Sequence, residues 1–365
     1  MREIIITVVT ISSISGVLAF LLSIANKTIA NYGEKTVTIN EENDYIVEGG
    51  ETLLSALIEE NIFIPSACGG KGSCGYCKVK VLEGGGQFLP TEKGYVTEEE
   101  KEQGIRLSCQ CKVKEDMKIE IPEELFSVEQ YETTVTKLEN LTDKIKLIRL
   151  EFNDGREMDY NPGQYIQILT PIYKESFEEI YRAYSITTPP SSKNAVELFI
   201  GYEGGICTTY VHDYLKVGDP LTIVGPFGDF QYRDNDREMI LVAIGTGMAP
   251  IMSILRFMAE EGIDRKATFY FGARTREDQY MMDELEELKK KLPRFKLKLC
   301  LSRPTEQCNW TGEVGRVTDL LEEYEENGEN KEAYLCGSPP MIDAVIPILR
   351  DKGYKEENIL YDKFE

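Results

Sequence analysis

The sequence predicts a multidomain chain of mixed α+β and α/β class that begins with an apolar helix. Three observations predict this organisation. Residues 4–25 carry no charged side chain, and residues 68–77 hold three cysteines in a glycine-rich loop between strand-like segments. From residue 237 onward, apolar strand patterns alternate with helical patterns, as expected for a parallel sheet covered by helices. The 365 residues suffice for two or three domains with proper cores.

Composition restricts the partners of the chain. Acidic residues number 63 and basic residues 41, which gives a net charge of -22 at pH 7. Binding a polyanion requires clustered Lys and Arg, so no nucleic acid partner is expected. Nine cysteines are an odd number for a disulfide framework, and metal-binding thiols must stay reduced. We therefore expect the bulk of the chain in a reducing compartment.

The uncharged segment of 22 residues, 4–25, would form a helix about 33 Å long, close to the ~30 Å hydrocarbon core of a bilayer. We expect residues 1–27 to be a retained, single-pass transmembrane helix. A cleaved signal peptide is the alternative, but Glu3 cancels the charge of Arg2 and the apolar run exceeds a normal signal sequence. Lys27 and Lys35 follow the segment, which favours an inner (plasma) membrane protein whose bulk is cytoplasmic.

Residues 34–124 predict a small domain around the cysteine loop. Expected strands lie at residues 35–40, 44–49, 78–82 and 118–121, with a short amphipathic helix at residues 52–60. The polar, acidic insert 84–104 is expected to loop over the surface. Hairpin, helix, cysteine loop and closing strands, in this order, resemble the β-grasp of plant-type ferredoxins.

Four cysteines form the candidate metal site. Cys68, Cys74 and Cys77 have the spacing C-x5-C-x2-C, and a fourth, Cys109, follows after 31 residues. Thiolates bind soft iron, and four of them hold a 2Fe–2S cluster. Glycines in the loop permit the turns through positive φ that wrapping a cluster requires. Zinc is the rival interpretation, although structural zinc sites usually pair two short C-x2–4-C knuckles.

Residues 128–233 predict an antiparallel barrel, because they contain closely spaced strands separated by turn residues. These strands are expected at residues 144–152, 163–169, 196–201 and 221–225. The tetrapeptide from Arg182 to Ser185 resembles the R-x-Y-S flavin signature of the ferredoxin-reductase superfamily. The resemblance implies bound FAD, with Arg182 on the pyrophosphate, Tyr184 over the isoalloxazine and Ser185 near flavin N5.

A second candidate flavin contact follows in the same region. Residues 204–209 form a glycine-rich turn before an apolar helical segment. Such a turn at a helix N-terminus suits a pyrophosphate. Thr208 and Thr209 are therefore expected to contact the FAD phosphates.

Residues 236–365 predict a Rossmann-like, NAD(P)-binding domain. The apolar strand 239–244 leads into a turn formed by Gly245, Thr246 and Gly247, with Pro250 three residues later. Pro250 departs from the G-x-G-x-x-G pattern, and this is the form that the ferredoxin-reductase superfamily shows in its nicotinamide domain. The turn is therefore expected to bind the coenzyme.

The C-terminal portion contains two further matches to that superfamily. Cys336 and Gly337 begin a turn that resembles its C-G-P-P motif, and the resemblance places Cys336 beside the nicotinamide ring. A buried thiol that merely ends a strand is the alternative. Residues 357–364 resemble the C-terminal tail whose aromatic residue shields the flavin. Phe364 is the match, with Tyr361 as a substitute, so Ser185, Cys336 and Phe364 are the expected residues at the reacting atoms.

The order of apolar segment, cysteine loop, flavin barrel and nicotinamide domain is similar to the family of F subunits of sodium-translocating NADH:quinone oxidoreductases. The likeness spans the chain and is sharpest at residues 67–77, 106–110 and 121–126. It identifies Cys109, not Cys111, as the fourth cluster ligand. It implies a membrane-anchored NADH dehydrogenase, the electron-input subunit of a complex with other membrane subunits. Hydride would pass from NADH to FAD, and single electrons would pass through the 2Fe–2S cluster to a membrane redox partner.

Two other functions stay open, as does the choice of coenzyme. The chain could be the NAD(P)H-dependent reductase component of a multicomponent oxygenase, but the C-x5-C gap and the apolar segment count against this. It could be a non-enzymatic, membrane-tethered redox sensor, but a complete hydride-transfer apparatus would be wasted there. NADH is the expected coenzyme. Ser302 and Arg303 nevertheless resemble the 2′-phosphate site of NADPH-using relatives, where the quinone oxidoreductase family has an acidic residue.

Overall fold

The computed structural model describes residue 6, residues 10–20 and residues 32–364. The chain forms two compact units, Met1–Ser127 and Val128–Glu365, which are taken separately below. Residues 10–20 are helical. Within the described ranges, no helix combines the length and the apolar character needed to cross a bilayer. The rest of the anchor expected over residues 1–27 lies outside those ranges.

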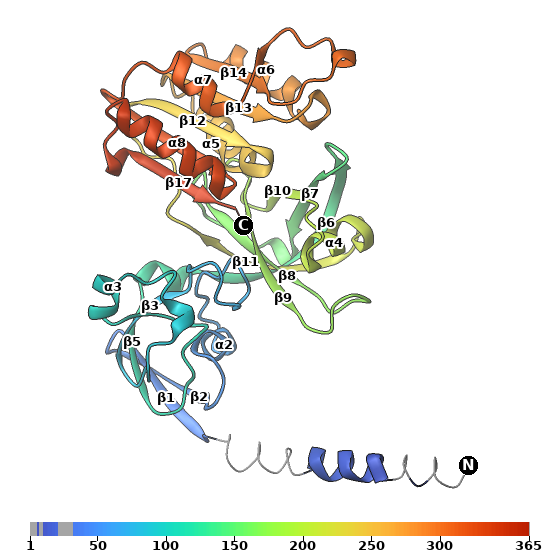
Figure 1. Cartoon of the computed structure of the whole chain (residues 1–365), viewed down its shortest axis with the longest axis vertical. Coiled ribbons are helices and arrows are strands. Elements are labelled where there is room, and N and C mark those ends of the chain that lie inside the picture. Colours follow the sequence, from blue (N-terminus) through green and yellow to red (C-terminus); the bar gives the residue numbers. More distant parts are fainter. Residues whose placement is uncertain (1–5, 7–9, 21–31, 365) are drawn as a thin grey trace. The chain divides into compact units, whose positions relative to one another are not determined.

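The first unit contains a five-stranded sheet in the order β2-β1-β5-β3-β4 (Figure 1). Its strands are β1 (Glu34–Ile39), β2 (Asn43–Glu48), β3 (Lys78–Glu83), β4 (Ile105–Leu107) and β5 (Met117–Glu120). Strand β1 pairs antiparallel with β2 and parallel with β5, which is the pairing of a β-grasp. Helix α2 (Leu53–Glu59) begins where the Thr52 hydroxyl accepts a hydrogen bond from Ser55 N at 3.1 Å.

The insert between β3 and β4 differs from the surface loop expected for it. It contains a 3₁₀ turn, η1 (Pro90–Glu92), and a short helix, α3 (Glu98–Glu102). Glu92 and Val96 are both buried. The polar composition of the insert was misleading because the charge of Glu92 is paired inside the unit rather than solvated.

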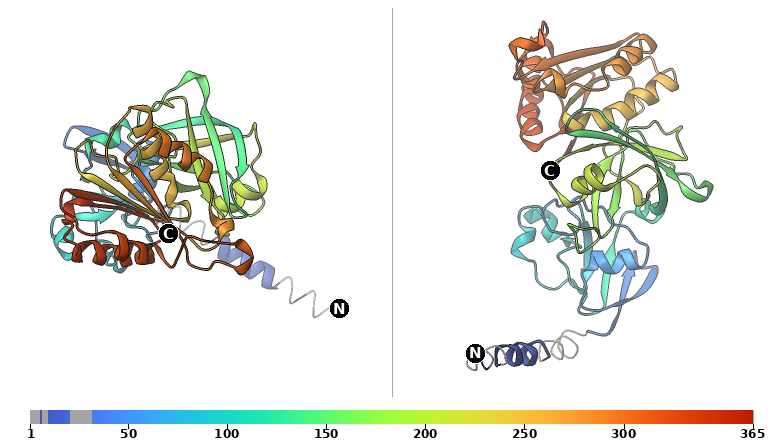
Figure 2. Two further views of the ribbon diagram at one scale, coloured as in Figure 1. Left: turned by 90° about the horizontal axis from the view of Figure 1, so that it is seen from above. Right: turned by 90° about the vertical axis from the view of Figure 1, so that its right-hand side faces the viewer.

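The second unit begins with six antiparallel strands in the order β10-β7-β6-β11-β8-β9. They are β6 (Glu129–Asn140), β7 (Ile145–Phe152), β8 (Tyr165–Thr170), β9 (Ile180–Ser185), β10 (Ala195–Gly201) and β11 (Pro220–Phe227). A bridge between Ile186 and Leu198 joins the edge strands β9 and β10, so the curved sheet closes into a barrel (Figure 2). Helix α4 (Ile206–Thr209) and the π-helical turn Tyr210–Tyr214 pack against its apolar interior.

The barrel is followed by a parallel sheet in the order β15-β14-β13-β12-β16-β17. Its strands are β12 (Glu238–Ile244), β13 (Ala267–Ala273), β14 (Phe295–Leu301), β15 (Glu313–Val314), β16 (Lys331–Gly337) and β17 (Ile359–Lys363). Helices α5 (Met248–Glu260) and α6 (Met282–Lys291) cover one face, and α7 (Val317–Tyr324) and α8 (Pro339–Asp351) cover the other (Figure 1). The alternation of strand and helix produces the doubly wound sheet that the sequence predicts.

Arg256 of α5 links the parallel sheet to the barrel inside the second unit. Its guanidinium donates to both carboxylate oxygens of Glu284, at 2.6 and 2.8 Å, and to the carbonyl of Thr187 at 2.9 Å. Glu197 of β10 lies 3.4 Å from the same group. Only 13% of the Arg256 side chain is exposed, so these bonds satisfy a charge that is largely removed from water.

We expect Arg256→Met to lower the free energy of unfolding of the second unit by about 3 kcal/mol, because it leaves Glu284 without its cation and leaves Glu197 paired with Arg149 alone. Chemical denaturation monitored by flavin fluorescence measures the change. Arg350→Met is the matched control, since Arg350 also pairs with a glutamate, Glu356, but at the exposed surface. A loss below about 1 kcal/mol is expected for the control. Equal losses for both variants would contradict a specific role for Arg256.

Candidate redox sites

The four predicted cluster ligands come together as two pairs of thiols. Cys68 and Cys74 lie in the loop before β3, Cys77 directly precedes β3, and Cys109 follows β4. The Sγ atoms of Cys68 and Cys74 are 3.3 Å apart, as are those of Cys77 and Cys109. Among the described residues, no three His, Cys, Asp or Glu side chains are grouped as one metal ion would require. Two pairs of thiolates suit two irons better than one tetrahedral zinc.

The loop that carries these thiols turns repeatedly through left-handed backbone conformations. Gly69, Gly70, Gly72 and Gly75 have φ values between 66° and 83°. Such a loop keeps backbone N–H groups close to the sulfurs, which a branched side chain would prevent. The predicted need for glycine is therefore met at these four positions.

Two side chains that the sequence did not single out hold this loop in place. The Tyr95 hydroxyl donates a hydrogen bond to the Ser73 carbonyl at 2.6 Å, and its ring lies where a Cβ on Gly75 would project. Gln110 Nε2 donates to Cys109 Sγ at 3.5 Å. Hydrogen bonds to ligand sulfurs tune the reduction potential of an iron–sulfur cluster. Tyr95 and Gln110 therefore belong to the candidate site.

Within each pair one thiol donates to the other, and this separates their pKa values. The hydrogen bond from the Cys74 thiol lowers the pKa of Cys68, and the hydrogen bond from the Cys77 thiol lowers the pKa of Cys109. Each pair thus contains one sulfur that ionises more readily than a free thiol, which favours binding of iron. Cys111 lies outside both pairs, and burial raises its pKa to about 12, as expected for an apolar filler.

A buried ion pair connects the insert to the ligand Cys109. Glu92 is fully buried and accepts two hydrogen bonds from Arg106, at 2.8 and 2.9 Å. It also accepts bonds from the backbone N–H groups of Leu89 and Leu107. The other N–H groups of the Arg106 guanidinium donate hydrogen bonds to the carbonyls of residues 85–87. Because Arg106 lies three residues before Cys109, this pair fixes the chain that leads into the fourth ligand.

We expect Glu92→Gln to destabilise the first unit by about 3 kcal/mol, because it leaves the Arg106 charge buried without a counterion. For a domain of this size, such a loss lowers the midpoint of thermal bleaching of the cluster by more than about 10 °C. Glu98→Gln is the control, since Glu98 pairs with Lys101 at the surface. An unchanged bleaching midpoint in Glu92→Gln would contradict the proposed link to the cluster.

The same pair predicts a pH dependence. Burial acts to raise the pKa of Glu92, but the bonds from Arg106 and the two backbone N–H groups outweigh it and lower the pKa below 4.5. A lowered folded-state pKa contributes stability that is present above the unfolded value and is lost as the pH falls through the folded one. Bleaching of the cluster should therefore accelerate below pH 4.5. Glu92→Gln, measured in the same buffers, should show a weaker acceleration.

The predicted flavin residues lie on β9, on both of its faces. Ser185 is buried, and its Oγ has no hydrogen-bond partner among the described residues. Gln167 of β8 shares this face, because Tyr165 pairs with Ser185, and Gln167 Nε2 is also buried without a partner. Buried polar atoms are rarely left unsatisfied, so this pair fits a polar ligand such as the flavin. In the sequence, the one sign that Gln167 could contact a ligand was its amide side chain within an otherwise apolar strand.

Arg182 and Tyr184 share the other face of β9. Tyr184 packs against the barrel core near Cys207, and burial raises its pKa. Arg182 donates to the Tyr181 carbonyl at 2.7 Å. On the adjoining turn, Thr208 Oγ1 accepts from Gly205 N and donates to Gly205 O, both at 3.1 Å. The Thr208 hydroxyl is thus engaged in its own turn, whereas Thr209 is buried beside it.

The predicted coenzyme turn lies against the end of β16. A Cβ on Gly247 would lie 2.2 Å from the Cys336 carbonyl oxygen and 2.9 Å from Gly337 N, so only glycine fits. Gly245 has φ +54°, and its carbonyl accepts a hydrogen bond from Tyr280 at 2.9 Å. Thr246 follows in the same turn, and Pro250 is buried in the first turn of α5.

Cys336 and Phe364 join this turn. Cys336 is fully buried, and burial raises its pKa, so it is a neutral thiol and no nucleophile. Phe364 N donates to the Gly337 carbonyl at 2.9 Å, and its side chain packs against the core. Tyr361 is half exposed on β17. The structure thus gathers residues 245–247, Cys336, Gly337 and Phe364 at the carboxyl ends of the central strands, where open α/β sheets bind ligands.

Sequence models of three domain families match the chain in the order of these sites. The 2Fe-2S iron-sulfur cluster binding domain matches residues 37–114, and the oxidoreductase FAD-binding domain matches residues 132–232. The oxidoreductase NAD-binding domain matches residues 241–346. Paired thiols, a flavin barrel and a coenzyme turn in one chain define an NAD(P)H-dependent oxidoreductase that uses FAD and a 2Fe–2S cluster.

Relatives that match the whole chain identify the family. The F subunit of the Na(+)-translocating NADH-quinone reductase of Methylococcus capsulatus is 38% identical over 410 residues, and the match covers 100% of both chains. That of Neisseria meningitidis serogroup B is 37% identical, and the match covers 99% of both. The chain belongs to the family of F subunits of the Na(+)-translocating NADH-quinone reductase, which confirms the resemblance inferred from its motifs.

Two solved structures of other reductases share the fold of the chain. A cytochrome P450 reductase of Amycolatopsis aligns with a TM-score of 0.74, 24% identity and coverage of 90% of this chain and 98% of that one. The ferredoxin reductase in carbazole 1,9a-dioxygenase aligns with a TM-score of 0.70, 22% identity and coverage of 91% and 98%. At this identity, the likeness concerns the fold alone.

Proposed function

We propose that this chain is the membrane-anchored electron-input subunit of a quinone-reductase-type complex. It takes hydride from NADH onto FAD and delivers single electrons through its 2Fe–2S cluster to a membrane redox partner. The observation that carries the proposal is the presence of two thiol pairs and a coenzyme turn in one chain whose full-length relatives bear the quinone-reductase name. Bound FAD accepts an electron pair and releases it singly, which matches the one-electron capacity of the cluster.

The protein residues bind and position the cofactors and the coenzyme, since hydride transfer needs neither a nucleophile nor a protonated base. Cys68, Cys74, Cys77 and Cys109 hold the two irons. Ser185 and Gln167 offer the flavin two buried polar groups that have no other partner among the described residues. The Gly245–Gly247 turn binds the coenzyme backbone. Cys336 and Phe364 line the place of hydride transfer and keep water out.

Further flavin contacts, also proposed, follow from the superfamily signature. With FAD bound, Arg182 would hold its pyrophosphate and Tyr184 would lie against the isoalloxazine. Thr208 and Thr209 would contact the phosphates. We also propose that the chain has four parts. Residues 1–27 are the anchor and residues 34–124 the cluster domain. Residues 128–233 are the flavin domain and residues 236–365 the coenzyme domain.

The proposed location is the inner membrane, with residues 1–27 as a single-pass anchor and the bulk of the chain in the cytoplasm. The uncharged segment 4–25 and the family membership support this placement. NADH and reduced thiols are both available on the cytoplasmic side. One anchor helix provides no path for an ion, so sodium translocation and quinone reduction belong to other subunits of the complex.

The proposal is tested with the full chain purified from membranes in detergent. It should show flavin and iron–sulfur absorbance, oxidise NADH with ferricyanide as acceptor, and copurify with other membrane subunits at low detergent. A colourless, zinc-loaded protein, or one that retains both cofactors but does not oxidise NADH, would refute the proposed activity.

A further inference from the structure

Two residues that follow β9, Thr187 and Thr188, are hydrogen-bonded to helix α5 of the parallel sheet. The Ser253 hydroxyl donates to the Thr188 carbonyl at 2.7 Å. The Arg256 guanidinium donates to the Thr187 carbonyl at 2.9 Å and to the Thr187 hydroxyl at 3.2 Å. Ser253, Thr187 and Thr188 are all buried. These bonds therefore join the barrel to the parallel sheet at a place that is shielded from water.

Each side of this contact continues directly into a candidate site. Helix α5 follows immediately after the coenzyme turn at residues 245–247, so Ser253 lies less than two helical turns from that turn. On the other side, Thr188 lies three residues after Ser185, whose buried hydroxyl has no hydrogen-bond partner among the described residues. The Ser253 hydroxyl thus closes a short path from the candidate flavin strand to the coenzyme turn.

The segment formed by Thr187 and Thr188 is also fixed to the barrel. The Tyr160 hydroxyl lies 2.8 Å from the Thr188 hydroxyl and 2.7 Å from the carbonyl oxygen of Pro189. Thr187 N donates to the carbonyl of Glu197 in β10 at 2.9 Å. Because the segment is hydrogen-bonded on both sides, a displacement of α5 must either move the flavin strand or break the bond from Ser253. The segment is a rigid connection between the two.

A second contact joins the barrel to the coenzyme turn. The Tyr280 hydroxyl donates to the Gly245 carbonyl at 2.9 Å, and its ring lies edge-on to that of Phe199 in β10, with centroids 5.3 Å apart. Gly201, at the end of β10, also approaches the turn, since a Cβ on it would lie 3.3 Å from Thr246 Cγ2. One contact alone would let the turn pivot. Contacts at two separate places fix both its distance and its orientation relative to the barrel.

We propose that Ser253 is a positioning residue for hydride transfer. Its bond to Thr188 sets the separation between the coenzyme turn and the flavin strand, and hence between nicotinamide C4, which gives up the hydride, and flavin N5, which receives it. The transfer converts NADH to NAD⁺ and gives the flavin two electrons and one proton. The reacting atoms must approach to about 3–3.5 Å, and misplacement by about 1 Å costs about 100-fold in rate. The inference rests on the proposed function, because it concerns the same transfer.

Ser253 tests this role more cleanly than Arg256 does. Arg256 also pairs with Glu284 and Glu197, so its replacement changes charge and stability together. Ser253→Ala removes one neutral hydrogen bond and leaves the volume of the side chain nearly unchanged. The variant therefore isolates the link between α5 and the Thr188 carbonyl.

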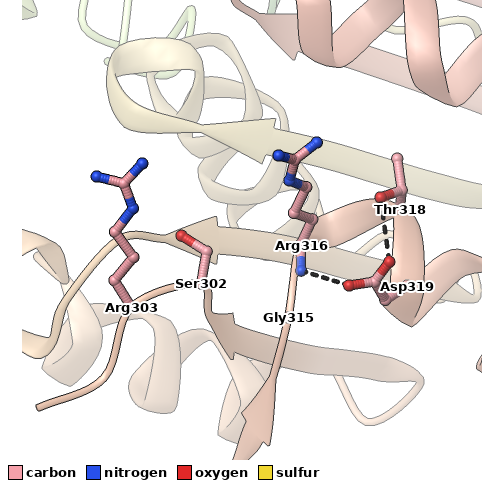
Figure 3. A pocket seen from close by; sticks show the side chains of 6 residues that line it. All are labelled: Ser302, Arg303, Gly315, Arg316, Thr318 and Asp319. Carbon is pink, nitrogen blue, oxygen red and sulfur yellow. Dashed lines mark hydrogen bonds between the residues drawn. The ribbon is translucent and has the colours of Figure 1, made fainter.

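Another part of the expected coenzyme site does not depend on this link. A polar cavity of about 510 Å³ lies at the carboxyl end of β14. It is lined by Ser302, Arg303, Gly315, Arg316, Thr318 and Asp319 (Figure 3). None of these residues belongs to α5 or to the segment of Thr187 and Thr188. In parallel sheets a dinucleotide lies across the carboxyl ends of several strands, so loss of the Ser253 bond should displace the nicotinamide end and largely preserve the affinity.

The test is anaerobic stopped-flow reduction of the full cofactor-loaded chain by NADH over a range of NADH concentrations. Ser253→Ala should lower the limiting rate constant of flavin bleaching by about 10-fold or more, with the Kd for NADH changed less than about threefold. A second measurement needs no turnover. The long-wavelength charge-transfer absorbance of the photoreduced chain with NAD⁺, which requires the nicotinamide to lie against the flavin, should weaken in Ser253→Ala.

Thr133→Val is the matched control. The Thr133 hydroxyl is fully buried and donates to the Leu221 carbonyl at 2.5 Å, so it joins two strands within the barrel. Both variants lose one buried hydroxyl-to-carbonyl bond, and both should lower the thermal midpoint of flavin release by about 2–4 °C. Only Ser253→Ala should change the limiting rate constant and the charge-transfer absorbance.

Three results would overturn the inference: a limiting rate constant in Ser253→Ala within threefold of the wild type, equal falls in Ser253→Ala and Thr133→Val, or a raised Kd for NADH with an unchanged limiting rate constant. If Ser253→Ala is recovered without flavin, Ser253→Cys replaces it, because the thiol fills the site with a weaker donor. The expected fall is then at least about threefold. Any of these results leaves the proposed function standing, whereas a wild-type flavin that NADH does not reduce refutes the proposed function and this inference together.

Discussion

Replacement of Cys109 by serine is expected to remove the 2Fe–2S cluster and leave the flavin bound. Cys109 pairs with Cys77 at 3.3 Å and is buried, so its loss leaves one iron with a single thiolate. Iron should fall from about two atoms per chain to less than about 0.2. Ferricyanide reduction by NADH should persist, because the flavin can donate electrons to ferricyanide directly. Electron transfer to acceptors that take electrons only from the cluster should fall more than about 100-fold.

Cys111→Ser is the matched control for Cys109→Ser. Cys111 is two residues away and equally buried, but it belongs to neither thiol pair. This variant should keep its iron and its electron transfer, with a modest loss of stability from the polar hydroxyl in an apolar place. Cluster loss in Cys111→Ser together with a full iron content in Cys109→Ser would show that the fourth ligand is assigned to the wrong residue.

Gly247→Ala is expected to abolish NADH oxidation while cluster absorbance is retained. The added methyl group would lie 2.2 Å from a backbone carbonyl oxygen that cannot move without displacing β16. The coenzyme turn must shift, and kcat/KM for NADH should fall more than about 100-fold, since misplacement by about 1 Å is that costly. Overpacking of this kind also lowers the free energy of unfolding by about 1–3 kcal/mol.

Gly262→Ala is the control for Gly247→Ala, because it introduces backbone strain without a steric clash. Gly262 follows α5 with φ +65°, and nothing lies within 4 Å of the place of its Cβ. The variant should lose about 1 kcal/mol of stability, because alanine disfavours positive φ, and keep its activity. If both variants retain wild-type kcat/KM for NADH, the turn at residues 245–247 does not bind the coenzyme.

Much of the fold follows from local sequence patterns. Four strands of the first unit and helix α2 lie within one residue of the predicted segments, because alternating and helical hydrophobic periods are local properties. Strand β4 was missed, since its three residues are too short to show a period. Three glycine-dependent sites, at residues 69–75, 245–247 and 337, were also predictable, because glycine alone adopts positive φ without strain and, at Gly247, because a Cβ would lie 2.2 Å from a backbone oxygen.

The contacts that support the sites could not be predicted in the same way. Glu92 and Arg106 are 14 residues apart and look like surface charges in the sequence, yet they are buried together. Tyr95 and Gly75 meet across a loop whose path no periodicity fixes. Gln167 becomes a candidate flavin contact only through its pairing with β9. Each of these depends on tertiary packing, on which sequence pattern carries no direct information.

In the proposed function, one chain carries electrons from NADH through flavin to the cluster. An anaerobic titration of the purified full chain with NADH, followed by visible absorbance and by electron paramagnetic resonance, tests it most directly. The flavin should bleach and the signal of a reduced 2Fe–2S cluster should appear, with both complete at about 1.5 equivalents of NADH for three electrons. Flavin bleaching without any cluster signal, in a chain that contains its full complement of iron, would contradict it.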